Sequence, residues 1–162
     1  MNKFYSNLWI LVPLLLVLWQ CHDSQEKQRK LDTEVGFHID SHGQFFRGDS
    51  AIASFDIETA DTEYKRTTGL MYRKKMKDNQ AMLFIFPDEQ PRYFWMHNTY
   101  IPLDIIFLDK NGKIVSVQKN AKPLNDQSLP SGKPAQYVLE IKGGLYDRLG
   151  LQTGDSLAVS KP

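Results

Sequence analysis

The sequence predicts an α+β domain with a compact, β-rich, barrel-like fold and two short helices. Six or seven short runs rich in β-branched and aromatic residues follow one another along the chain. The Asn111-Gly112 dipeptide lies between two of these runs, which is a strong signal for a β-hairpin. The order of elements lacks the regular alternation of strand and helix that a doubly wound parallel sheet requires.

The expected strands are short and differ in how deeply they are buried. A small strand or hairpin is expected at Phe37–Asp40 and Gln44–Arg47. Met82–Phe86 is a continuous apolar run, which predicts a strand buried on both faces that stops at Pro87. The other expected strands are Ala51–Glu58, Tyr93–His97, Leu103–Asp109, Lys113–Gln118, Tyr137–Ile141 and Ser156–Val159.

Two short helices and one long loop complete the expected domain. Asp61 is a suitable N-cap for a helix at Thr62–Met71. Gly143-Gly144 introduces a second helix at Leu145–Leu149. The segment Ala121–Pro134 is rich in proline, serine and asparagine and is expected to be a loop.

The N-terminus has the pattern of an export signal. Lys3 supplies positive charge, and Leu8–Trp19 is a run of 12 uncharged residues. As a helix this run would extend roughly 18 Å, against a hydrocarbon core of about 30 Å, so it has the length of a signal-peptide core. Cys21 follows almost at once and resembles the lipidated cysteine of bacterial lipoproteins, although Trp19 and Gln20 replace the usual small residues. An uncleaved membrane anchor is the alternative.

We therefore expect a signal peptide at residues 1–20, a flexible tether at 21–35 and a single globular domain at 36–162. The tether is polar and lacks an apolar period. The protein would be exported and held at a membrane by a lipid on Cys21, facing the periplasm or the cell surface. Because Cys21 is the only cysteine, an intrachain disulfide and a multi-cysteine zinc site are excluded.

Charge and motifs weigh against several classes of function. The 20 basic and 19 acidic residues give a net charge of +1, so no nucleic-acid partner is expected. There is neither a glycine-rich phosphate loop nor a Gly-x-Ser-x-Gly motif, and no cofactor is expected. Methionines and His97 would suit copper, but methionines within apolar runs are ordinary core residues, so no metal site is expected.

Several stretches resemble, in order, the bacterial and archaeal family named domain of unknown function 192. They are Thr68–Arg73, Met82–Pro87, Phe94–Thr99, Ile101–Phe107, Tyr137–Glu140 and Gly154-Asp155. The resemblance runs from about Ala51 to Val159 and implies a compact β-rich fold, but it brings no activity. The family commonly has lysine where this chain has His97, and a histidine there would make any charge at the position pH-dependent.

The stretch from Trp95 to Asp104 is the best candidate for a site. In a strand, Trp95 and His97 would point to one side and Met96 to the core. Pro102 would break the strand and return Asp104 toward Asn98. An aromatic ring beside amide and carboxylate groups suits a sugar or another polar ligand. The expected ligand-binding residues are Arg73, Trp95, His97, Asn98 and Asp104. In the alternative interpretation Trp95 belongs to the core, and Asn98 and Asp104 cap a turn.

Glu140 is the second candidate, because a carboxylate within an apolar strand must be exposed or paired. Arg73 could pair with Glu140 or with Asp104, since its planar fork suits carboxylates. The weak catalytic candidates are Asp104, Glu140 and His97. Asp104 and Glu140 would form an acid/base pair of the glycosidase type if their separation were right.

Three functions remain open from the sequence. The first is a binding or accessory module of the cell envelope that presents the Trp95–Asp104 surface to a polar ligand, a glycan or a partner protein. The second is a small hydrolase acting on an envelope polymer, with Asp104 or Glu140 as acid/base. The third is a scaffold whose matched residues serve the fold alone.

Overall fold

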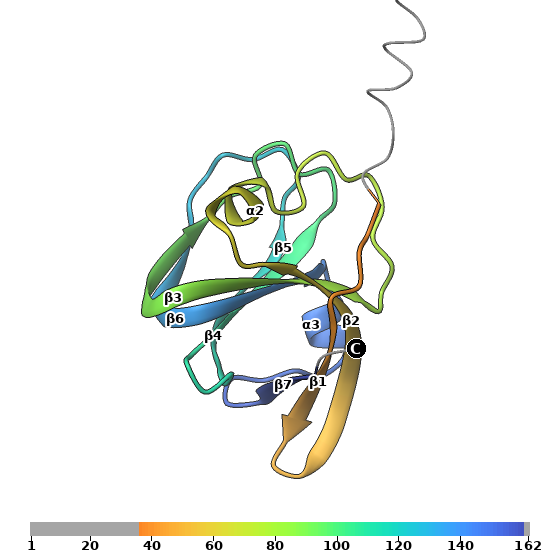
Figure 1. Ribbon diagram of the computed structural model, residues 1–162, viewed down its shortest axis with the longest axis vertical. Coiled ribbons are helices and arrows are strands. Elements are labelled where there is room, and N and C mark those ends of the chain that lie inside the picture. Colours follow the sequence, from red (N-terminus) through yellow and green to blue (C-terminus); the bar gives the residue numbers. More distant parts are fainter. Residues whose placement is uncertain (1–35, 161–162) are drawn as a thin grey trace, which may run out of the picture. The chain divides into compact units, whose positions relative to one another are not determined.

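A seven-stranded mixed sheet with the strand order β5-β4-β6-β3-β2-β1-β7 forms the framework (Figure 1). The computed structural model describes residues 36–160. The strands are β1 (Ser41–Arg47), β2 (Ser50–Ala60), β3 (Gln80–Phe94), β4 (Leu103–Leu108), β5 (Ile114–Ala121), β6 (Leu129–Lys142) and β7 (Ser156–Ser160). The helices are α2 (Glu63–Thr68) and α3 (Leu145–Arg148). The predicted β-rich, barrel-like α+β fold is confirmed as a half-barrel with two short helices.

The two ends of the sheet meet at the predicted hairpin turn. The Leu157 N–H donates to the Gly112 carbonyl at 2.9 Å, and the Ile114 N–H donates to the Asp155 carbonyl at 2.9 Å. Gly112 has φ +75°, and a Cβ atom there would lie 2.7 Å from the Leu157 carbonyl oxygen. Only glycine fits this close approach, which lets β7 reach the β4–β5 hairpin.

The central strands β3, β4 and β6 bury residues on both faces. One core cluster includes Phe45, Ile57, Leu83, Ile106, Leu139 and Leu145. The other includes Leu70, Met82, Phe84, Met96, Ile105 and Val138. The continuous apolar runs are therefore explained by burial on both sides, as expected for Met82–Phe86. Burial of each such side chain contributes about 1.5–3 kcal/mol to folding.

Strand β3 is much longer than predicted. It continues through Pro87 to Phe94 and joins two runs that the sequence separates. Its register with β6 shifts between Ile85 and Gln90, so Pro87 lies in an irregular stretch that needs no regular ladder donor. The expected stop at Pro87 was therefore wrong. Strand β6 likewise begins at Leu129, inside the segment expected to be a loop.

Helix α2 begins one residue later and ends three residues earlier than the predicted Thr62–Met71. Thr62, not Asp61, is the N-cap, and its hydroxyl accepts the Lys65 N–H at 3.2 Å. The helix stops at Gly69, whose φ is +49° and whose missing side chain leaves room for the Phe84 ring. Residues 36–160 contain no helix that is long and apolar enough to cross a membrane. The predicted signal peptide, lipidated Cys21 and tether lie outside the described residues.

Candidate functional site

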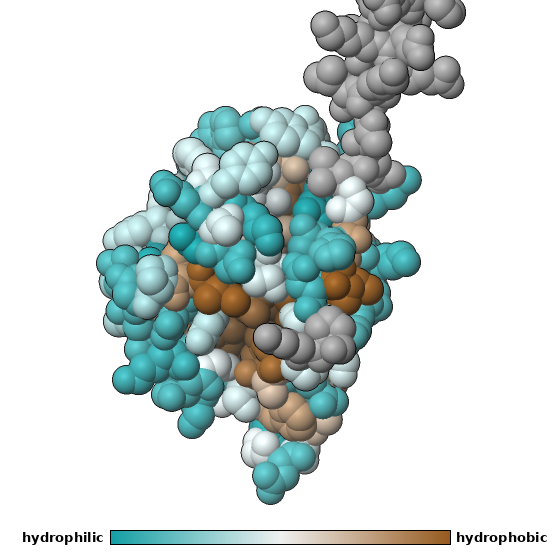
Figure 2. Space-filling view, viewed as in Figure 1, coloured by the Kyte–Doolittle hydropathy of each residue, from teal (hydrophilic) through white to brown (hydrophobic). Residues whose placement is uncertain are grey.

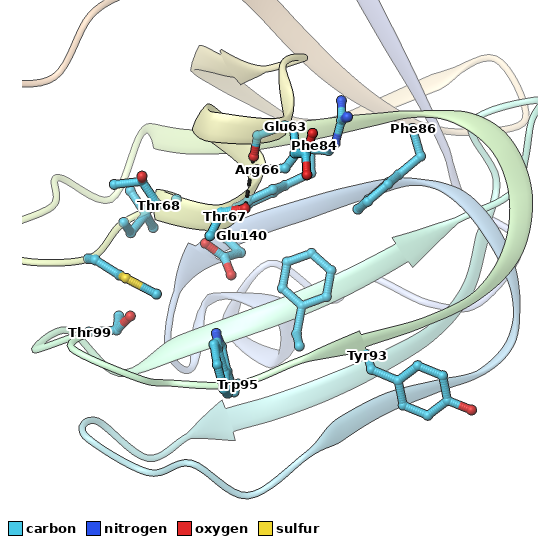
Figure 3. A pocket seen from close by; sticks show the side chains of 14 residues that line it. Glu63, Arg66, Thr67, Thr68, Phe84, Phe86, Tyr93, Trp95, Thr99 and Glu140 are labelled. Carbon is cyan, nitrogen blue, oxygen red and sulfur yellow. Dashed lines mark hydrogen bonds between the residues drawn. The ribbon is translucent and has the colours of Figure 1, made fainter.

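A pocket of about 370 Å³ lies between α2, the residues that follow it, and strand β3 (Figure 3). Its walls are mainly aromatic, with the rings of Phe84, Phe86, Phe94 and Trp95. Phe94 meets the Phe84 ring edge-on, with centroids 5.0 Å apart and an interplanar angle of 87°. The aromatic walls are thus held in fixed positions by their own packing.

The carboxyl group of Glu140 points into this pocket from β6 (Figure 3). Glu140 lies opposite Met82 on β3 and Ile105 on β4. Directly opposed residues of an antiparallel pair share a face, so the pocket lies on the Met82–Ile105 face of the sheet. Glu140 is 4% exposed, and among the described residues its side chain makes no hydrogen bond or ion pair.

This burial changes the protonation of Glu140. Loss of solvation raises the pKa of Glu140 to about 8, and the nearby positive charge of Arg73 offsets part of that effect. The carboxyl group is therefore mostly protonated at neutral pH. A buried acid with a pKa near neutrality inside a pocket is a mark of functional sites.

Arg73 does not supply the missing partner. Its two terminal nitrogens donate to Glu58 of β2, Nη1 to Oε2 at 2.7 Å and Nη2 to Oε1 at 2.6 Å. Arg73 is 7% exposed, so this bidentate pair is largely desolvated. The predicted pairing of Arg73 with Glu140 or Asp104 is wrong, because Glu58 occupies the guanidinium fork.

Trp95 forms the outer rim of the pocket. It is 51% exposed, whereas the following residue, Met96, is buried in the core. The His97 ring lies 5.2 Å from the indole ring, and His97 Nδ1 lies 2.7 Å from Asp126 Oδ1. The expected placement of Trp95 and His97 on one side and Met96 on the other is confirmed, although β3 ends before Trp95.

Asp104 lies on the opposite face of the sheet from Glu140. It is opposed to Ile141 on β6, one residue away from Glu140, and successive residues of a strand face opposite sides. It is fully buried and accepts the N–H groups of Asn120 and Tyr146, both at 2.8 Å. Asp104 therefore fixes the β5 end and the start of α3. It belongs to neither the expected ligand surface nor an acid/base pair with Glu140.

Asn98 lies beside the pocket and joins two loops. Its side-chain amide donates to the Tyr72 hydroxyl at 2.9 Å, which ties the segment after β3 to the segment after α2. The expected ligand-binding residues thus separate in the structure. Trp95 borders the pocket, His97 and Asn98 support its rim, and Arg73 and Asp104 are structural.

The comparisons with known proteins agree with this architecture. The sequence profile of the domain of unknown function 192, described as an uncharacterized ACR, matches residues 45–159. The chain belongs to this family. A UPF0127 protein of Pyrococcus furiosus is 30% identical over 104 residues, covering 63% of this chain and 84% of the relative.

Two solved structures resemble this DUF192 protein. A Sinorhizobium meliloti protein described as a candidate transcription regulator has a TM-score of 0.72 and 33% identity, covering 76% of this chain and 98% of the other. A Novosphingobium aromaticivorans protein of unknown function has a TM-score of 0.69 and 35% identity, covering 72% and 83%.

Sequence reasoning missed the aromatic walls and the helix side of the DUF192 pocket. Phe84 and Phe86 are two residues apart in β3, so they lie on one side of the strand with Met82. This parity was visible in the sequence. The contribution of Thr67 and Gly69 was not, because it depends on how α2 packs against β3.

A second cavity of about 270 Å³ lies on the other face of the half-barrel. Leu83, Ile85, Tyr137 and Leu157 line it, and Figure 2 shows apolar side chains gathering in the middle of the molecule. Its ionisable lining residues are the exposed Lys110 and the half-buried Tyr137, so it holds no buried acid comparable with Glu140. Within residues 36–160 no three histidine, cysteine, aspartate or glutamate side chains come together as a metal site.

Proposed function

We propose that this DUF192 protein is a binding module of the cell envelope, which takes a small ligand into the pocket between α2 and β3. One observation carries the proposal. Glu140 is a buried carboxyl group without a hydrogen-bonding partner among the described residues, and it points into an aromatic cavity. A buried polar group without a partner destabilises the fold, and a bound ligand could supply the missing hydrogen bond or ion pair.

The pocket has the composition of a small-molecule site. A volume of about 370 Å³ falls in the range of ligand pockets, and aromatic walls with a few polar groups suit a ligand with an apolar body. Trp95 contributes a half-exposed ring at the rim, where it can close over a bound molecule. This assigns binding to the pocket beside Trp95 and not to the whole Trp95–Asp104 surface.

The envelope location rests on the N-terminal sequence. The uncharged run Leu8–Trp19 and the cysteine that follows it support export and lipidation at Cys21. The tether at 21–35 would then separate the domain from the membrane. The net charge of +1 does not favour nucleic acid as a ligand, although the Sinorhizobium relative is described as a candidate transcription regulator.

The hydrolase alternative needs Asp104 and Glu140 as an acid/base pair, and the structure does not bring these two residues together. Asp104 lies on the other face of the sheet and His97 is not among the residues that line the pocket, so of the three catalytic candidates only Glu140 faces it. Glu63 of α2 also lines the pocket, but it is exposed, so Glu140 is the buried carboxyl group of the lining. One buried carboxyl group is enough to bind a ligand. The scaffold alternative is tested by the same experiment as the binding role.

The test is a ligand screen on the full chain, read by NMR chemical shifts. Saccharides, amines, amides and carboxylates would be added singly, and the responding residues mapped. We expect hits that perturb the pocket and weaken at least tenfold in Trp95→Ala and Glu140→Gln. Tyr100→Ala removes an exposed aromatic residue outside the pocket and is the matched control. The binding role would be refuted if no compound binds, or if the affinity of every compound that binds is unchanged in both pocket variants.

A further inference from the structure

We infer that the ligand is an organic ammonium cation, whose charged group meets Glu140 while its apolar body lies against Phe94 and Trp95. This inference rests on the proposed binding function and names the ligand class of the same pocket. Three observations support it. Glu140 has no ion-pair partner within residues 36–160, the walls of the pocket are aromatic, and few other polar groups in the pocket are available to bind a ligand.

Glu140 lacks a counter-ion of its own within residues 36–160. Arg73, whose positive charge acts on Glu140, directs both terminal nitrogens to Glu58 at 2.6–2.7 Å, and its buried Nε has no hydrogen-bond partner. Arg66 lines the pocket, but its Nη1 donates to the carbonyls of Asp61 and Ile85 at 2.6 and 2.9 Å. Neither guanidinium group donates to Glu140, so a ligand cation would be the first direct partner of the Glu140 carboxylate.

The aromatic walls favour a cation over an anion. Ring faces carry negative potential and attract ammonium and guanidinium groups. Phe86 already shows this, with the Arg92 guanidinium 4.0 Å and the Arg66 guanidinium 5.4 Å from its centroid. Phe94 and Trp95 line the same pocket, and within residues 36–160 no lysine or arginine lies over either ring.

Most polar side chains that line the pocket are exposed or already hydrogen-bonded, which disfavours a polyhydroxylated ligand. The Thr67 hydroxyl donates to the Glu63 carbonyl at 2.9 Å, and the Thr99 hydroxyl donates to the His97 carbonyl at 3.1 Å. Glu140 is therefore the main deep polar group that is free to orient a ligand. A molecule with one charged end and an apolar body matches this arrangement better than a sugar does.

Binding is then linked to release of a proton. The carboxyl group is mostly protonated at neutral pH, and an ammonium ion stabilises its ionised form. The ionisable groups that face the region are Arg73 with Glu58, Glu63 and Arg66 of α2, and His97 behind Trp95. Below the pKa of Glu140, affinity should rise with pH by up to about tenfold per unit and level off above about pH 8.

The test compares 2-phenylethylammonium with 2-phenylethanol, which have nearly the same shape but differ in charge. Calorimetry on the full chain at pH 6 and pH 8, in two buffers of different ionisation enthalpy, measures affinity and proton release. We expect the ammonium ion to bind at least tenfold more tightly than the alcohol at pH 8, to lose most of that advantage at pH 6, and to release a proton.

Two substitutions separate recognition from folding. Glu140→Gln keeps the shape and removes the charge, so it should abolish the preference for the ammonium ion while the alcohol still binds. Glu89→Gln is the same change at an exposed position outside the pocket and should preserve the preference. A thermal unfolding curve confirms that each variant is folded.

The outcomes distinguish the two proposals. N-acetylglucosamine is the third, polyhydroxylated probe. Equal binding of alcohol and ammonium ion in the pocket, or pocket binding by N-acetylglucosamine alone, would overturn the cation inference and leave the binding function intact. If none of the three probes perturbs the pocket, the cation inference is refuted, and the broader screen decides the binding function separately.

Discussion

Tyr72 and Asn98 hold each other through two hydrogen bonds at the edge of the pocket. The Tyr72 N–H donates to the Asn98 carbonyl at 2.8 Å, and the Asn98 side-chain amide donates to the Tyr72 hydroxyl at 2.9 Å. Both residues have positive φ, +64° for Tyr72 and +50° for Asn98, which is rare outside glycine and asparagine. The pair fixes the loop that carries Trp95 against the loop that follows α2.

Asn98→Ala should therefore destabilise the protein by about 1–2 kcal/mol, because it loses the amide donor and strains the backbone. Asn98→Gly keeps the backbone conformation but loses the bond, and Tyr72→Phe loses the hydroxyl alone. Chemical denaturation of the three variants separates the two effects. Equal stability of Asn98→Ala and Asn98→Gly would show that backbone strain at this position is unimportant.

Glu140 makes the stability of the protein depend on pH. Its pKa is raised from 4.5 to about 8 in the folded state, so the native protein holds a proton that the unfolded chain releases between those values. The free energy of unfolding should fall as pH rises from about 5 to 8, by at most about 1.4 kcal/mol per pH unit, and then level off.

The Glu140→Gln variant removes this titration. Its stability relative to the wild type should increase between pH 5 and pH 8, as measured by urea denaturation at each pH, while Glu89→Gln should track the wild type. A difference between Glu140→Gln and the wild type that stays constant over this range would contradict the raised pKa.

Asp104→Asn should destabilise the fold without affecting the pocket. The carboxylate accepts N–H groups from Asn120 and Tyr146, and an amide can offer its oxygen to only one of them. We expect a loss of about 2–4 kcal/mol from thermal or urea unfolding, because a buried donor is left facing another donor. Loss of ligand binding in a variant that remains folded would place Asp104 in the site after all.

Arg73→Met should cost about 3–5 kcal/mol, because it leaves the Glu58 carboxylate largely buried without its bidentate partner. It should also raise the pKa of Glu140 further, since Arg73 is the charge that lowers it. Arg148→Met removes an exposed ion pair with Asp78, which solvent screens, and should cost far less than Arg73→Met. Similar losses in the two variants would mean that the Arg73–Glu58 pair has no special role.

Cys21→Ala tests the proposed anchoring. If Cys21 carries the lipid, the variant should leave the membrane fraction or accumulate as an unprocessed precursor of higher mass. Fractionation followed by mass spectrometry of the N-terminal peptide measures both. Unchanged fractionation and an unmodified Cys21 in the wild type would rule out lipidation.

The sequence predicted local features better than distant ones. The Asn111-Gly112 hairpin and the alternation of Trp95, Met96 and His97 depend on neighbouring residues, and both were confirmed. Pro87 was misread because a stretch of irregular pairing with β6 accommodates it within one long strand. That accommodation depends on residues about fifty positions away in the chain.

The sequence predicted only part of the candidate site, because the rest depends on contacts between residues that are distant in the chain. Asp104 was placed with Asn98 because the two are close in sequence, but pairing of β4 with β6 turns Asp104 to the other face. Glu140 was recognised as unusual within an apolar strand. That it lacks a partner could not be foreseen, because Arg73 is taken by Glu58, a pairing that depends on how the loop after α2 meets β2.

A carbon-13 NMR titration of the Glu140 carboxyl group in the ligand-free protein tests the account most directly. The signal is assigned by its absence in Glu140→Gln. A carboxyl group that is buried in the pocket and lacks a hydrogen-bonding partner should titrate with a midpoint near 8, the value that burial produces here. A midpoint near 4.5, the ordinary value for glutamate, would show a solvated or paired carboxylate and would contradict the proposed site.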